Sequence, residues 1–249
     1  MTSVFRYQAT SFLEISMRKI ISASLFFLSL TAFIAPLSLA QQRAGYYRYP
    51  AIHDNTIVFT AEGDLWTVPI EGGAARRLTT HAGQETNAAI SPDGSTIAFS
   101  AEYEGPQEVY TMPLNGGLPV RRTWDGGRAV VTGWTPDGKI LYTSNRFSLL
   151  PNTQLIALAL DGHKEVLPLS QAADGDYDTG SKNLFFTRFA FQGSYTKRYK
   201  GGTAQNIWRF DGTSEAVPLT SDYPGTSAHP YVWNGRVIFV SDRDGSMNL

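Results

Sequence analysis

Histidine, carboxylate and hydroxyl side chains occur throughout this sequence, but none of them falls into a familiar catalytic spacing. The chain has no Gly-x-Ser-x-Gly, no His-Glu-x-x-His and no glycine-rich phosphate loop followed by lysine. It also has no cysteine, which excludes disulfides and thiolate metal sites. The histidines lie far apart, at or beside predicted turns: His53, His81, His163 and His229. We therefore expect turn or surface histidines rather than a ligand set, with no catalytic residue, no metal and no cofactor in this chain.

The segment "DGDYDTG", residues 174–180, places a carboxylate at every second position, as calcium loops do. A helix-flanked calcium loop needs glycine at its sixth position and glutamate at its twelfth, where this chain has Thr179 and Phe185. We therefore interpret the segment as a degenerate form of the Pro-Asp-Gly turn found elsewhere in the chain.

A basic stretch lies in the longest predicted loop, "RFAFQGSYTKRYKGGTAQN", residues 188–206. Long loops on a rigid scaffold often carry binding residues. The candidate contacts for a peptide, an anionic group or a partner domain are Arg188, Lys197, Arg198, Tyr199 and Lys200. A solvated loop without a ligand is the simpler interpretation of the same residues.

One strand-turn-strand pattern recurs four times along the chain. Its turn glycines are Gly72, Gly116, Gly162 and Gly212, spaced 44, 46 and 50 residues apart. Glu-Gly, Asn-Gly and Asp-Gly pairs suit the positive backbone angles of tight hairpins. The recurring segments are "LWTVPIEGGAARRLT" (65–79), "VYTMPLNGGLPVRRT" (109–123), "LIALALDGHKEVLPLS" (155–170) and "IWRFDGTSEAVPLT" (207–220).

Each of these segments follows another predicted hairpin, and a final such hairpin lies near residue 240. The second strands of these hairpins carry the aromatic residues Phe59, Phe99, Tyr142, Phe186 and Phe239. Two hairpins in roughly 40 to 50 residues make one propeller blade, which must stack on its neighbours to bury both faces. We therefore predict an all-β fold with Ala88, Ala89, Trp134 and Trp233 on or near the innermost strands. The predicted blades are 46–80, 86–124, 129–170, 174–220 and, as a first hairpin only, 227–249.

The first forty residues differ from the rest of the chain. Arg18-Lys19 precedes an apolar segment that ends in Ser38-Leu39-Ala40, which is typical of a secretory signal peptide cleaved after Ala40. An uncleaved membrane anchor is the alternative, and residues 1–16 are an over-called start if synthesis begins at Met17. We expect a periplasmic or secreted protein.

The balance of charge restricts the choice of partner. The formal net charge of the chain is −1, and no basic face follows from the pattern of lysine and arginine. Binding to a phosphate backbone requires such a face, so we expect no nucleic-acid partner.

Three segments together resemble the N-terminal propeller of tricorn-type serine peptidases. They are "RYPAIHDNTIVFTAEGDLWTVPIEGGAARRLT" (48–79), "TKRYKGGTAQNIW" (196–208) and "SDRDGSMNL" (241–249), and the resemblance runs from about Tyr46 to Leu249. It implies a TolB-like six-bladed β-propeller, of which this sequence holds four blades and the start of a fifth. The family pattern decays at Tyr177 to Gly180, where the Pro-Asp-Gly turn is lost.

The resemblance implies an accessory role in peptide degradation, as a gate, channel or substrate filter. In the family, a second propeller, a PDZ-like domain and a catalytic serine peptidase domain follow, so no catalytic residue carries over to this chain. The implied partners are peptides, those missing downstream domains and, in the full-length protein, further copies of itself. Two alternatives remain open: a stand-alone TolB-like propeller that binds a protein, and a propeller fused to another hydrolase.

Overall fold

The computed structural model describes residues 45–149, 152–191 and 199–249. All regular elements in these residues are β-strands, which confirms the predicted all-β class. The same residues contain no helix long and apolar enough to cross a membrane. The predicted signal peptide lies outside the described residues.

The strands form antiparallel sheets in chain order, four of them four-stranded and the last two-stranded. The first sheet contains β1 (Arg48–His53), β2 (Thr56–Ala61), β3 (Asp64–Pro69) and β4 (Arg76–Arg77). The second contains β5 (Glu85–Ile90), β6 (Thr96–Ala101), β7 (Glu108–Pro113) and β8 (Val120–Arg121). The third contains β9 (Ala129–Trp134), β10 (Ile140–Ser144), β11 (Gln154–Leu158) and β12 (Lys164–Val166). The fourth contains β13 (Asp174–Tyr177), β14 (Leu184–Thr187), β15 (Ile207–Phe210) and β16 (Val217–Pro218), and the fifth contains β17 (Ser227–Trp233) and β18 (Arg236–Ser241).

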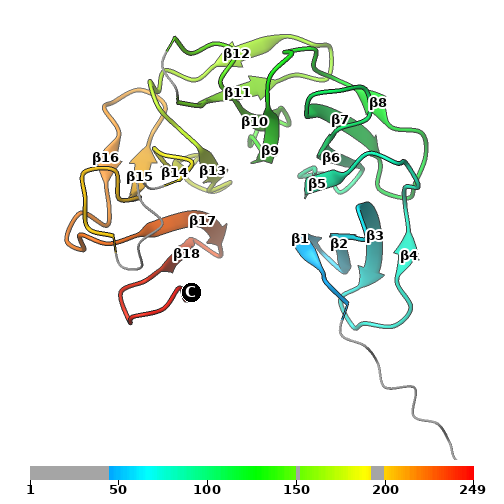
Figure 1. Ribbon diagram of the computed structural model, residues 1–249, viewed down its shortest axis with the longest axis horizontal. Coiled ribbons are helices and arrows are strands. Elements are labelled where there is room, and N and C mark those ends of the chain that lie inside the picture. Colours follow the sequence, from blue (N-terminus) through cyan, green and yellow to red (C-terminus); the bar gives the residue numbers. More distant parts are fainter. Residues whose placement is uncertain (1–44, 150–151, 192–198) are drawn as a thin grey trace, which may run out of the picture. The chain divides into compact units, whose positions relative to one another are not determined.

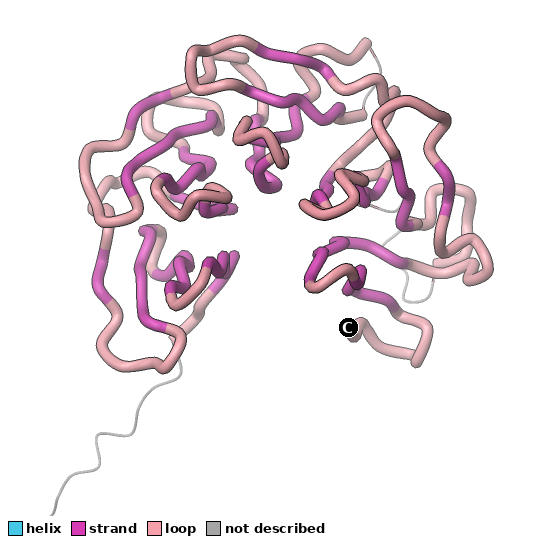
Figure 2. The backbone as a smooth tube through the Cα atoms, turned by 180° about the vertical axis from the view of Figure 1, so that it is seen from behind, coloured by secondary structure: helices cyan, strands magenta, loops and turns pink. Residues whose placement is uncertain are grey.

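Neighbouring sheets meet through their first strands. β1 contacts β5, β5 contacts β9, β9 contacts β13, and β13 contacts β17. Within residues 45–249 these five strands lie nearest the centre of the arc of sheets (Figure 1), and the view from behind shows the same arrangement (Figure 2). We call them the inner strands. Each is the edge strand of its own sheet in the hydrogen-bonding order.

Apolar side chains fill the space between neighbouring sheets. One core cluster combines Ala98 and Val109 of the second sheet with Trp134 and Tyr142 of the third. The Trp134 indole N–H also donates a 3.0 Å hydrogen bond to the carbonyl oxygen of Ala89 on the neighbouring inner strand. The predicted positions of Ala88, Ala89, Trp134 and Trp233 on the inner strands are thus confirmed. The first three also pack between sheets, whereas Trp233 ends β17 with 56% of its surface exposed.

The hairpin turns hold their shape through local carboxylate hydrogen bonds. Asp93 accepts hydrogen bonds from the hydroxyls of Ser91 and Ser95, and these bonds lower its pKa to about 2. Asp137 accepts a 2.6 Å bond from the Thr135 hydroxyl in the corresponding turn of the third sheet. In the fourth sheet, Asp178 takes this place and accepts a bond from Ser181. The loss of Pro-Asp-Gly therefore leaves the carboxylate of the turn intact.

A buried threonine ties the end of the fourth strand to the third strand in three sheets. The hydroxyl oxygens of Thr79, Thr123 and Thr220 accept hydrogen bonds of 2.9, 2.8 and 3.0 Å from the backbone N–H groups of Leu65, Val109 and Ile207. All three threonines are buried. The fourth strands of these sheets are only two residues long, so they form few backbone hydrogen bonds with the third strands. The threonine hydroxyls add a hydrogen bond that keeps each fourth strand attached to its sheet.

Replacing Thr123 by valine should destabilise the chain by about 1–3 kcal/mol. The change leaves the Val109 N–H without its acceptor and removes the hydrogen bond that the Thr123 hydroxyl donates to buried Glu108. The measurement is the free energy of unfolding from urea denaturation. Thr123→Ser, which keeps the hydroxyl, is the control and should lose less; a valine variant as stable as the unchanged chain would contradict this role.

Candidate functional site

Three of the five inner strands share a backbone irregularity that the sequence analysis did not predict. In β1, Tyr49 and Pro50 bulge out between the pairs Arg48–Thr60 and Ala51–Val58. They therefore lie opposite Phe59, the aromatic residue of the second strand. The result is a β-bulge, which re-aims the bulged side chains.

The same bulge recurs at the same place in other sheets. In β5, Asn87 and Ala88 bulge between Thr86 and Ala89, opposite Phe99. In β17, His229 and Pro230 bulge between Ala228 and Tyr231, opposite Phe239. β9 has a one-residue irregularity at Thr132, while β13 pairs regularly and places Gly175 opposite Phe186.

The first residue of each full bulge has a positive φ angle. The values are 51° for Tyr49, 54° for Asn87 and 54° for His229. This left-handed region is uncommon for residues other than glycine, especially for bulky ones, and such residues concentrate at functional sites. We refer to Tyr49, Asn87 and His229 as the bulge residues.

All three bulge residues line one cavity of about 890 Å³. Residues from all five sheets contribute to its wall, including Arg128, Asp174 and Arg188. A cavity of this size is within the range of ligand-binding sites in proteins. The inner strands therefore converge on a space that can hold a ligand.

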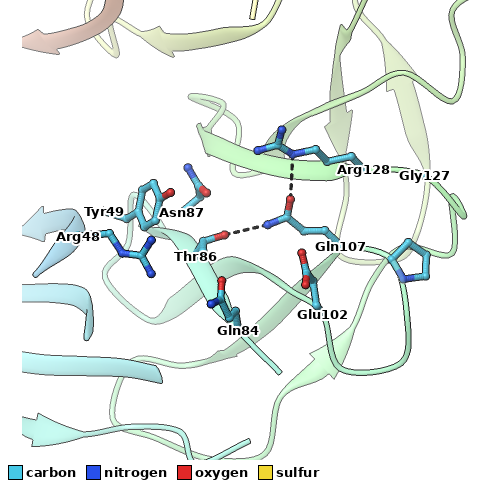
Figure 3. A pocket seen from close by; sticks show the side chains of 10 residues that line it. Arg48, Tyr49, Gln84, Thr86, Asn87, Glu102, Gln107, Gly127 and Arg128 are labelled. Carbon is cyan, nitrogen blue, oxygen red and sulfur yellow. Dashed lines mark hydrogen bonds between the residues drawn. The ribbon is translucent and has the colours of Figure 1, made fainter. Parts of the chain in front are cut away.

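A smaller pocket of about 340 Å³ shares Tyr49, Asn87 and Arg128 with the large cavity (Figure 3). The Nε–H of Arg128 donates a 3.2 Å hydrogen bond to Gln107, whose amide donates a 2.9 Å bond to Thr86. This chain of bonds holds Arg128 through Nε, and no acceptor within residues 45–149, 152–191 and 199–249 binds its two terminal nitrogen atoms.

Two guanidinium groups, those of Arg48 and Arg128, line this pocket together with one carboxylate, that of Glu102. Arg48 lies 5.2 Å from the ring centre of Tyr46 and 5.5 Å from that of Tyr49. In the part of the chain that the structure describes, no salt bridge joins Arg48 or Arg128 to an acidic side chain. A planar guanidinium binds carboxylates through paired hydrogen bonds, so the pocket can accept an anionic group.

The opposite part of the cavity wall carries an ion pair between the fourth and fifth sheets. His229 Nδ1 lies 2.8 Å from Asp174 Oδ2, and the other Asp174 oxygen accepts bonds from the Thr187 hydroxyl and backbone N–H. Nearby, Asp176 accepts a 2.7 Å hydrogen bond from the Val232 N–H across the same pair of sheets. Burial raises the pKa of Asp176.

These contacts give the "DGDYDTG" carboxylates three different partners. Asp174 and Asp176 lie on β13 and bind the fifth sheet, whereas only Asp178 lies in the turn. The interpretation of the whole segment as a turn was therefore too broad, because its first half is a strand. Across the described ranges, no group of three or more His, Cys, Asp or Glu residues is placed to hold a metal ion.

The five residues predicted as contacts in the long loop do not lie together on the cavity wall. Arg188 lines the large cavity, stacks on Trp208 at 5.2 Å, and donates a 2.7 Å bond to Gln171. Tyr199 is half-buried and Lys200 is exposed. Lys197 and Arg198 lie outside the described residues. Only Arg188 of these residues is placed on the cavity wall, and a ligand role for this set stays a prediction.

The sequence analysis did not predict the other polar residues that line the cavity. It placed His229 at or beside a turn, whereas His229 lies within β17 and faces Asp174. A signal for the bulges was present, since Pro50 and Pro230 lie within β1 and β17, and proline within a sheet is found at edges and bulges.

The amino-acid sequence is similar to a known protein family and to two curated relatives. A family model described as the tricorn protease N-terminal beta propeller domain matches residues 44–249. Tricorn protease homolog 1 of Streptomyces coelicolor is 32% identical over 209 residues, which are 81% of this chain and 19% of the relative. The tricorn protease of Thermoplasma volcanium is 27% identical over 83% of this chain and 21% of the relative. The chain thus spans about a fifth of the length of these relatives.

Solved structures share the fold. The crystal structure of the tricorn protease matches with a TM-score of 0.70 and 24% identity, over 82% of this chain and 21% of that one. A putative TolB from Agrobacterium tumefaciens matches with a TM-score of 0.64 and 22% identity, over 79% of this chain and 70% of that one. These matches confirm the resemblance inferred from the sequence.

The His229–Asp174 pair predicts a pH-dependent contact. The Asp174 carboxylate raises the pKa of His229 above its ordinary value of 6.5, since it favours the charged imidazolium. The stabilisation is present below pH 6.5 and is lost as the pH rises through the raised pKa. An NMR titration should show the pKa of His229 falling in Asp174→Asn and staying raised in the control Asp178→Asn. An unchanged titration in Asp174→Asn would contradict the pairing.

Proposed function

Because this chain belongs to the family of the tricorn protease N-terminal β-propeller domain, we propose that residues 45–249 are the peptide-contacting accessory propeller of a longer tricorn-like peptidase. In this role the propeller gates or filters peptides, and hydrolysis takes place in domains beyond this chain. The observation that carries the proposal is the cavity at the inner strands with its adjoining smaller pocket, where no salt bridge within the described residues engages Arg48 or Arg128.

The chemistry of the cavity suits a peptide. Arg128 offers a guanidinium group in both the cavity and the smaller pocket, Arg48 offers one in the smaller pocket, and the other part of the cavity wall carries the Asp174–His229 ion pair. A peptide carries a carboxylate at one end and an ammonium group at the other, together with main-chain donors and acceptors between them. A cavity with a guanidinium group, hydrogen-bonding side chains and apolar wall residues such as Val130 and Phe191 can bind such a ligand.

A second candidate function is a stand-alone protein-binding propeller. The match to the TolB structure favours it only at the level of the fold, because identity is 22%. The two candidates differ in their ligand: a short peptide in the cavity for the first, and a folded partner on the outer surface for the second.

We also propose that the protein is exported, because the apolar segment before Ser38-Leu39-Ala40 has the form of a signal peptide. The expected result is a mature N-terminus at Gln41 in protein recovered from the periplasmic fraction of an expressing bacterium, read by N-terminal sequencing. Recovery of the uncleaved chain from the membrane fraction would favour an anchor.

Peptide binding without cleavage is the main test of the proposed function. We expect the purified chain to bind a fluorescein-labelled peptide of about ten residues with a free carboxyl terminus. Fluorescence anisotropy measures the affinity, and mass spectrometry should show the peptide intact. Arg128→Gln should weaken binding about tenfold, since one charge-assisted contact is lost.

Two controls make this result specific. Arg209→Gln removes an exposed arginine of β15 that does not line the cavity, and it should leave the affinity unchanged. A peptide with an amidated carboxyl terminus should bind the unchanged chain and Arg128→Gln equally weakly. Cleavage of the peptide by the purified chain, or equal binding by all variants, would contradict the proposal.

A further inference from the structure

We propose that the bulge residues Tyr49, Asn87 and His229 form a contact ring that binds the main chain of an extended peptide. This inference rests on the proposed function and deepens it, because it names the part of the peptide that the cavity wall recognises. The recognised group is the peptide backbone rather than its side chains.

The repeated geometry is the first argument. Three sheets place a positive-φ residue at the same step of the inner strand, opposite the aromatic residue of the second strand. All three side chains line the same cavity. A bulge common to three repeats therefore sets three side chains around one space.

The choice of residues is the second argument. If the chain needed only the bend, glycine would adopt the positive φ angle without a steric cost. Instead the bend carries Tyr49 and His229, which are bulky and exposed, together with half-buried Asn87. Asparagine and histidine adopt this region more readily than most residues, whereas a bulky tyrosine does not, so the strain at Tyr49 in particular indicates that its side chain contributes something else, such as a contact with a ligand.

The hydrogen-bonding capacity of the three side chains is the third argument. A tyrosine hydroxyl and an asparagine amide can each both donate and accept hydrogen bonds, and Nε2 of His229 accepts when the imidazole is neutral and donates when it is charged. A peptide main chain presents donors and acceptors in alternation, whatever its sequence. Groups that serve either role suit recognition of the main chain, whereas recognition of one side chain would need a fixed donor or acceptor.

Asp174 gives one of these groups a defined orientation. Its carboxylate lies 2.8 Å from Nδ1 of His229, so Nδ1 carries the proton and Nε2 remains for a ligand. The side chain of His229 is 69% exposed, and it lies on the cavity wall. The imidazole is thus held in place and still reachable from the cavity.

A purely structural role for the bulges is the competing explanation. The inner strands are sheet edges, and bulges prevent edge strands from pairing with other chains. Glycine substitutions separate the two explanations, because glycine keeps the positive φ angle and the bulge while it removes the side chain.

The experiment compares the chain with a variant carrying Tyr49→Gly, Asn87→Gly and His229→Gly. The probe is a fluorescein-labelled alanine-serine peptide of about ten residues, used in parallel with the same peptide methylated on its backbone nitrogen atoms. The unchanged chain should bind the unmethylated peptide at least about tenfold more tightly than the methylated one. The triple variant should bind both peptides with the same, weaker affinity.

The matched control is Asn234→Gly, which makes the same change at a positive-φ residue in the exposed β17–β18 turn, outside the cavity. It should keep the preference for the unmethylated peptide. Thermal unfolding reports whether each variant is folded. If the triple variant does not fold, the single Asn87→Gly variant provides the test, because asparagine-to-glycine is the smallest change at the three sites.

The outcomes distinguish this inference from the proposed function. If the glycine variant binds and discriminates as the unchanged chain does, the ring is refuted while peptide binding by the cavity stands. If the unchanged chain binds the peptide but does not discriminate against backbone methylation, recognition of the main chain is refuted. If the unchanged chain binds no peptide, the proposed function fails, and the ring fails with it.

Discussion

The burial of apolar side chains between neighbouring sheets is the constraint on which this structure depends. A four-stranded sheet of this length has two apolar faces and cannot cover either of them by itself. Phe99 and Tyr142 are fully buried and Phe186 is nearly so, each within a cluster of apolar side chains. Because each sheet needs its neighbours, the first strands converge on one side, and their loops and bulges come to share one cavity.

Polar groups make the contacts between sheets specific. Glu85 at the start of β5 accepts a 2.9 Å hydrogen bond from the Leu65 N–H of the first sheet, and burial raises the pKa of Glu85. Asp125 accepts a 2.9 Å bond from the Tyr142 hydroxyl and pairs with Lys164. Apolar packing alone would allow sheets to slide over each other, whereas a buried hydrogen bond has its full strength in one register only.

The sequence was sufficient for the fold but only partly for the site. Turn glycines and aromatic residues such as Phe99 repeat at regular spacing because hairpin geometry and burial act locally, so the sheets and their order could be predicted. The cavity residues Arg128, Asp174 and His229 could not, since they come together through contacts between sheets. Bulges depend on the pairing register of two strands, which periodicity does not report. Arg188 was singled out for its loop, yet it lies where that loop leaves β14 and faces the cavity.

The bulges of the inner strands also determine which residues can line the cavity wall. Each bulge belongs to a separate sheet and is set by pairing within its own hairpin, so we expect a substitution at one of them to leave the pairing of the others in place. At these positions the positive φ angle favours a small set of residue types, with glycine, asparagine, aspartate and histidine the least costly. The bulge residues that line the cavity can therefore be changed one sheet at a time, but only to the few residue types that tolerate a positive φ angle. A library limited to these four residue types at the three positions would sample ligand preference while keeping the backbone angle of each bulge.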